Sequence, residues 1–160
     1  MNTMVRPAVM SDLPRILELV HELAAYEKAA DQVEATQADF ESVLFPREGA
    51  PTAYAHVAVV DDEVVGIAVW FLTFSTWTGT NGIWLEDLFV DPAQRGTGLG
   101  RALLAALAHE CVVRGLRRLE WCVLDWNTPS IEFYDSLGAT PQDEWTTYRL
   151  SGDALTSLER

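Results

Sequence analysis

The stretch LEDLFVDPAQRGTGLGRALLAALA, residues 85–108, joins an apolar run to a helical run through a loop that contains three glycines. Gly96, Gly98 and Gly100 stand at alternate positions in this loop. Ordering a glycine costs conformational entropy, so the pattern indicates a backbone that bends unusually or is closely approached by another group. The first amides of a helix lack intrahelical partners and lie at the positive end of its dipole. The loop therefore predicts a phosphate-binding site.

Two common phosphate-binding motifs do not fit this loop. A Walker loop requires Lys and then Ser or Thr after its last glycine, whereas Arg101 and Ala102 follow Gly100. A dinucleotide fingerprint has the spacing G-x-G-x-x-G near the first strand, whereas this loop has G-x-G-x-G late in the chain. A plain structural turn is the alternative interpretation, because glycine triplets also occur in ordinary connections.

The length and composition predict one globular domain over residues 1–160. The chain has 160 residues, of which 49% are apolar, enough for a packed core but not for two ordinary domains. No run of about eighteen apolar residues is present, so we expect a soluble protein without a membrane span. The first residues resemble neither a secretory signal nor a transit peptide, and a cytoplasmic location is therefore the expectation.

The net charge of −13 bears on the choice of partner. It disfavours a nucleic-acid backbone and favours a cationic small molecule or protein tail, although acidic residues also serve solubility. The two cysteines, Cys111 and Cys122, lack metal-ligand spacing, so we expect buried thiols, no disulfide and no metal site.

Periodicity and turn residues predict alternating strands and helices on both sides of the glycine loop. We expect strands in residues 4–9, in 54–73 as a hairpin that turns at Asp61 and Asp62, in 82–90, in 116–124 and near 145–150. We expect helices after Ser11, after the Thr36–Asp39 capping box to about Leu44, over about 98–114, and over 129–137 with Thr128 as N-cap.

The loop and its flanks together resemble the GNAT acetyltransferase superfamily. Arg95, Gly98 and Gly100 match the Arg/Gln-x-x-Gly-x-Gly/Ala signature for acetyl-coenzyme A. Upstream, WLEDLFVDP resembles the central strand of the family, and downstream, DWNTPSIEFYDSLGA resembles its N-x-x-[AS]-I-x-[FL]-Y-x-x-x-G segment. With RPA and ELAAYE near the N-terminus, the chain looks most like the spermidine/spermine branch and its relatives that act on diamines or thialysine.

The resemblance implies an α/β fold of the GNAT acyl-CoA N-acyltransferase type. This fold has a mixed, mostly antiparallel sheet of about six to seven strands, flanked by about four helices. The resemblance also implies a homodimer.

The resemblance implies a coenzyme site that consists largely of main chain. The strand before the loop would expose its backbone to the pantetheine arm, the loop amides would hold the pyrophosphate, and residues at the start of the next helix would touch the coenzyme. For Asn127, capping of that helix is the alternative. The implied residues are Leu88, Phe89, Val90, Arg95, Gly96, Thr97, Gly98, Leu99, Gly100, Arg101, Asn127, Ser130 and Tyr134.

Acetyl transfer to an amine needs a proton acceptor, because an alkyl amine with a pKa of about 10.4 is protonated at neutral pH. Glu86 and Asp87 are neighbours in a predicted strand, so they are expected to point to opposite faces. By the resemblance we expect Glu86 to be the base or ammonium anchor, with Asp87 as second choice. Tyr134 matches the residue that protonates the leaving thiolate, and a core aromatic is the alternative.

The expected amine-binding residues are less closely matched. By the resemblance they are Tyr26, Glu27, Glu86, Asp87, Asp143 and Glu144. The sequence departs from the branch at Lys28 and lacks a glycine before Trp145, which puts a polyamine substrate in question.

The sequence therefore predicts an enzyme that transfers acetyl from acetyl-CoA directly to a primary amine of a small cationic substrate. The alternatives are a protein, peptide or amino-sugar amine as acceptor, or a non-catalytic acyl-CoA sensor on the same fold.

Overall fold

Five strands form one sheet in the order β1-β2-β3-β4-β5. The strands are β1 (Thr3–Pro7), β2 (Tyr54–Val60), β3 (Glu63–Ser75), β4 (Thr80–Val90) and β5 (Leu119–Glu120). The first four strands pair antiparallel in sequence order, and β5 pairs parallel with β4. The parallel pair requires a crossover, and α3 (Leu99–Arg114) supplies it.

The computed structural model describes residues 1–159. They form two units, an N-terminal unit (Met1–Cys122) that contains the sheet and a C-terminal unit that begins at Val123. Within the described residues, no helix is long and apolar enough to cross a membrane.

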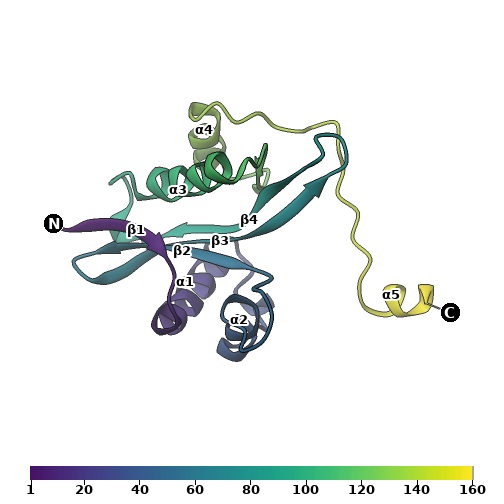
Figure 1. Cartoon of the computed structure of the whole chain (residues 1–160), viewed down its shortest axis with the longest axis horizontal. Coiled ribbons are helices and arrows are strands. Elements are labelled where there is room, and N and C mark those ends of the chain that lie inside the picture. The colour runs from purple at the N-terminus through teal and green to yellow at the C-terminus, as the bar shows by residue number, and fades with distance from the viewer. Residues whose placement is uncertain (160) are drawn as a thin grey trace. The chain divides into compact units, whose positions relative to one another are not determined.

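Helices cover both faces of the sheet in the N-terminal unit. Figure 1 shows α1 (Leu13–Tyr26) and α2 (Gln37–Leu44) on one face and α3 on the other. The α1 face is sealed by a cluster that includes Leu13, Ile16, Leu19, Val57 and Ile67. Buried residues on α3, among them Leu103 and Leu107, cover the opposite face. Three short 3-10 turns complete this unit: Met10–Asp12, Ala30–Gln32 and Pro92–Gln94.

Most local signals in the sequence are confirmed. Asp61 and Asp62 form the turn of the β2–β3 hairpin with φ angles of 47° and 69°, values that a tight hairpin turn requires. The capping box of Thr36 and Asp39 opens α2. Gly115 ends α3 in the left-handed conformation, with a φ of 69°.

The C-terminal unit contains α4 (Thr128–Ser136) and α5 (Gly152–Leu158). Asn127, rather than the expected Thr128, is the N-cap of α4, because its side chain accepts from the Ser130 amide. The helix α5 was not expected from the sequence.

The sheet has fewer strands than the six to seven expected. Residues 145–150 were expected to form a strand, but they pair with no strand within residues 1–159. The predicted strand over 116–124 is reduced to the two residues of β5. A strand persists only where a neighbour completes its hydrogen-bond ladder, and neither segment finds one over its predicted length. Since β5 ends at Glu120, Cys122 is exposed and not buried as expected, whereas Cys111 is buried.

Candidate active site

Strand β4 contains one residue more than its partner at the start of the LED motif. Val69 of β3 pairs with Asp87, and the next residue, Trp70, pairs with Leu85. Glu86 is therefore the extra residue of a β-bulge. Bulges break the ladder locally and re-aim the side chains beside them, and they are frequent next to active sites.

Because of the bulge, two residues that are three positions apart in β4 lie on the same face of the sheet. Val69 and Phe71 are two residues apart in β3 and share a face, so their partners Asp87 and Trp84 share it too. The indole Nε1 of Trp84 donates a hydrogen bond of 3.1 Å to Oε2 of Glu86. The expectation that Glu86 and Asp87 point to strictly opposite faces is therefore wrong at this position.

Asp87 lies on the α1 face, two residues before the buried Phe89. Loss of water contact, the largest cause, and the negative charges of Glu86 and Glu27 together raise the pKa of Asp87 from 3.8 to about 6. Loss of surrounding water also raises the pKa of Glu27, which follows the last turn of α1. Three carboxylates from β4 and from the end of α1 thus act on one another. Such a group attracts a cation, and a carboxyl that titrates near neutral pH can accept a proton.

Arg95 connects the glycine loop to α1 and β4, the elements next to these three carboxylates. Its guanidinium carbon lies 5.0 Å from the ring centre of Tyr26 and 5.5 Å from that of Phe89. A guanidinium over aromatic rings at these distances makes a favourable cation–π contact. The end of α1, the end of β4 and the start of the loop are thereby held together.

A second arginine links α1 to β3 and to the residue that follows β4. Arg15 of α1 forms ion pairs with Glu22 at 3.0 Å and with Asp91 at 3.2 Å, and its Nε donates to the Val64 carbonyl. Asp91 in turn accepts from the Ala93 amide at 2.9 Å. The segment that leads from β4 into the glycine loop is therefore anchored on both α1 and β3.

The glycine loop leaves its backbone open to an approaching ligand. Gly96 and Gly98 have φ angles of 77° and 84°, which favour glycine, and Gly98 is the N-cap of α3. A Cβ at Gly96, Gly98 or Gly100 would meet no atom within 4 Å. Close packing therefore does not explain Gly100, whereas an approaching ligand would. The first helical bond is that of the Ala102 amide to the Gly98 carbonyl, so the amides before it remain available to an anion.

The second half of β4 has one open edge. Strand β5 pairs only with Ile83 and Trp84, while β4 continues to Val90. On their other edge, Leu88, Phe89 and Val90 pair with β3. Within the described residues, no strand covers the opposite edge at these three positions, so their main chain can bind an extended ligand, as the sequence predicts.

Three predicted site residues lie together on α4 in the C-terminal unit. The Asn127 side chain is buried and accepts from the Ser130 amide at 3.4 Å, which is the capping role left open above. Tyr134 is half-buried, and its ring centre lies 5.5 Å from that of Phe133. Capping gives the side-chain oxygen of Asn127 a structural role. Its contact with the coenzyme stays a prediction.

Asp143 and Glu144, the remaining predicted amine-binding residues, are exposed within the C-terminal unit. They lie outside any helix or strand, and their role stays a prediction. Within residues 1–159, no three His, Cys, Asp or Glu side chains are arranged to hold a metal ion.

The two central carboxylates differ in their exposure to water. Glu86 is exposed, whereas Asp87 is half-buried and has the raised pKa. The signal that could have shown this is the register between β3 and β4, and a single sequence does not reveal that register.

Comparison with known proteins assigns this sequence to one family. The sequence model of the Acetyltransferase (GNAT) family matches residues 16–139. A thialysine N-epsilon-acetyltransferase of Bos taurus is 33% identical over 97% of this chain and 96% of its own. The L-ornithine N5-acetyltransferase NATA1 of Arabidopsis thaliana is 28% identical over 100% of this chain and 89% of its own.

Solved structures agree with the fold. An integron cassette protein from the mobile metagenome of V. cholerae superposes with a TM-score of 0.81 and is 25% identical, over 100% of this chain and 99% of its own. The expected α/β fold and family resemblance are confirmed.

The raised pKa of Asp87 predicts a stability that depends on pH. The folded state holds the proton of Asp87 more tightly than the unfolded chain does, so stability falls as pH rises from about 3.8 to about 6. Asp87→Asn removes this cost. At pH 8 we expect the variant to unfold at higher urea concentration, with a gain of up to about 3 kcal/mol that vanishes below the lower value.

The matched control is Asp31→Asn, at an exposed aspartate in the 3-10 turn Ala30–Gln32. Its unfolding curve should follow that of the unmodified protein at both pH values. A pH-independent effect of Asp87→Asn would contradict the raised pKa.

Proposed function

Because this chain belongs to the Acetyltransferase (GNAT) family, and so is an N-acetyltransferase, we propose that it transfers the acetyl group of acetyl-CoA to the terminal amine of a small cationic molecule. The observation that carries the proposal is Asp87, a half-buried carboxyl with a pKa of about 6 that shares its surroundings with Glu27 and Glu86. The names of the relatives, which include thialysine and ornithine acetyltransferases, favour a side-chain amine of a basic amino acid or a diamine as acceptor.

Glu27 and Glu86 bind the cationic substrate in this proposal. Their negative charges attract an ammonium group, and the nearby ring of Tyr26 adds an aromatic surface at the end of α1. Both glutamates are exposed to solvent. This exposure suits a group that must stay charged while it binds the substrate.

Asp87 acts as the base in this proposal, in place of Glu86. The amine must lose a proton before it can react, and its pKa is about 10.4 in water. A carboxylate with a pKa of about 6 accepts that proton about two units more readily than an ordinary aspartate with a pKa of 3.8. It is also largely ionised at neutral pH, so it is ready to accept.

Acetyl-CoA supplies the thioester that the amine attacks. The residues of the loop fit its pyrophosphate, because the amides at the start of α3 are free of helical bonds and the space in front of Gly96, Gly98 and Gly100 is open. The open edge of β4 at Leu88 to Val90 suits the amides of the pantetheine arm. Tyr134 is proposed as the group that protonates the departing thiolate.

Three broader expectations belong to the same proposal. The family match runs across the boundary between the two units, which supports one catalytic domain over the whole chain. A homodimer remains a proposal from the resemblance and from the prevalence of two-fold symmetry among soluble oligomers. A cytoplasmic location rests on the sequence alone.

The roles of the two neighbouring carboxylates can be separated by kinetics. With acetyl-CoA and a panel of thialysine, ornithine, diamines and spermidine, Asp87→Asn should lower kcat about 100- to 10,000-fold, because it removes the base. Glu86→Gln should mainly raise KM for the amine, because it removes a charge that binds the ammonium in ground and transition states alike. Free thiol release is the measurement. Equal kcat values for Asp87→Asn and the unmodified enzyme would overturn the assignment of the base.

The pyrophosphate site has its own test. Gly98→Glu places a carboxylate in the loop and should abolish acetyl-CoA binding in calorimetry. The matched control is Gly49→Glu, because Gly49 has a similar φ of 80° with open space around it and lies outside the loop. It incurs the same backbone strain and should bind the coenzyme normally. Retained affinity in Gly98→Glu would refute the loop assignment.

A further inference from the structure

A cavity of about 280 Å³ lies at the end of the sheet where β1 stops and β2 begins. None of its residues belongs to the proposed acetyl-transfer site. Its lining includes Leu44 and Phe45 after α2, Tyr54 and His56 of β2, and Glu110 of α3. The volume lies just below the range of about 300–1,000 Å³ typical of ligand pockets, so the cavity suits a small molecule.

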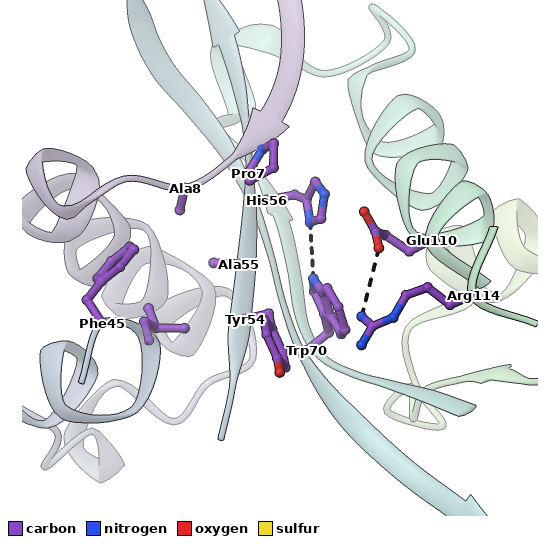
Figure 2. A pocket seen from close by; sticks show the side chains of 10 residues that line it. Pro7, Ala8, Phe45, Tyr54, Ala55, His56, Trp70, Glu110 and Arg114 are labelled. Atoms are coloured by element: carbon purple, nitrogen blue, oxygen red, sulfur yellow. Dashed lines mark hydrogen bonds and ion pairs between the residues drawn. The ribbon is translucent and has the colours of Figure 1, made fainter. Parts of the chain in front are cut away.

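Stacked aromatic rings form one wall of this cavity. The ring centres of Tyr54 and Trp70 are 4.5 Å apart, with an interplanar angle of 21°. The Trp70 indole Nε1 donates a hydrogen bond of 3.1 Å to Nδ1 of His56. Figure 2 shows these side chains beside Glu110 and Arg114, with Phe45 across β2. The arrangement gives the cavity rigid walls.

His56 presents an unused hydrogen-bond donor to this cavity. Its residue is only 6% exposed, and burial lowers its pKa, with Glu110 partly opposing this, so the ring is neutral at neutral pH. Since Nδ1 accepts from Trp70, the proton of the neutral ring must lie on Nε2. No described residue accepts from Nε2, and no fully buried side-chain nitrogen lacks a partner, so Nε2 faces accessible space.

The two charged residues of the cavity are also incompletely paired. Nη1 of Arg114 lies 3.8 Å from Oε2 of Glu110, beyond hydrogen-bond distance, and the guanidinium carbon lies 5.9 Å from the Trp70 ring centre. Exposed ion pairs contribute little stability, so a ligand with both charges can replace this contact at small cost. One carboxylate, one guanidinium and the His56 N–H are then available together.

We propose that this cavity is a second small-molecule site that binds a zwitterionic α-amino acid with an apolar side chain. The ligand carboxylate accepts from Arg114 and from Nε2 of His56, and its ammonium group pairs with Glu110. The apolar side chain lies against the ring of Tyr54, which stacks on Trp70 on the same side of β2. An anion alone would be repelled by Glu110 and a cation alone by Arg114, so the balanced charges select a ligand that carries both.

L-phenylalanine is the probe, titrated into the full chain at neutral pH by calorimetry and by NMR. For twelve non-hydrogen atoms we expect a dissociation constant on the order of 1 mM. The His56 Nε2 signal should shift on binding. Phenethylamine, which lacks the carboxylate, and 3-phenylpropionate, which lacks the ammonium group, should each bind at least about tenfold more weakly.

Variants identify the site independently of the ligand series. Arg114→Gln should weaken L-phenylalanine binding about tenfold or more, whereas Arg117→Gln, at an exposed arginine outside the cavity, should not change it. Glu110→Gln should weaken L-phenylalanine but strengthen 3-phenylpropionate, because it removes a negative charge. Asp87→Asn should leave this binding unchanged, which separates the cavity from the site of acetyl transfer.

Three results would overturn the proposal. The first is no binding of L-phenylalanine up to about ten times the expected dissociation constant. The second is unchanged affinity in Arg114→Gln. The third is a loss of dimer mass in light scattering of Arg114→Gln, which would show that a second copy of the chain covers the cavity.

Discussion

One extra residue in β4 determines where the carboxylate of Asp87 lies. Without the bulge at Glu86, the ladder with β3 would alternate regularly, and Asp87 and Trp84 would face opposite sides of the sheet. With it, Asp87 lies on the α1 face beside the apolar cluster, and Glu86 turns to accept from Trp84. The carboxylate of Asp87 thereby loses much of its contact with water and lies near two other negative charges, and both effects raise its pKa.

The bulge would have little use without the elements around it. Arg95 lies against both Tyr26 and Phe89, and Arg15 forms an ion pair with Asp91, so α1 is linked to the end of β4 and to the residue that follows it. These contacts hold the end of α1, with Glu27, near Asp87. They also fix the entry to the glycine loop, where the proposed pyrophosphate site begins. The carboxylates proposed to bind the amine and the loop proposed to bind the pyrophosphate thus lie on connected elements of the N-terminal unit.

The sequence predicted those parts of the site that depend on local backbone conformation. Gly98 and Gly115 bound α3 as expected, because a positive φ at a helix end favours glycine whatever the rest of the fold does. The capping box at Thr36 and the turn at Asp61 and Asp62 are local in the same sense. The bulge is not local, because it exists only as a mismatch between β3 and β4. The missing strand at 145–150 and the hydrogen bond between His56 and Trp70 likewise depend on partners far along the chain.

Asp87 is expected to titrate near neutral pH because of where the bulge places it. The most direct measurement is a titration of the Asp87 carboxyl carbon by ¹³C NMR, with the signal assigned from the spectrum of Asp87→Asn. The account predicts a midpoint near pH 6 in the free enzyme. A midpoint near the ordinary value of 3.8 would contradict it, because Asp87 would then be a solvated carboxylate with no special capacity to accept a proton.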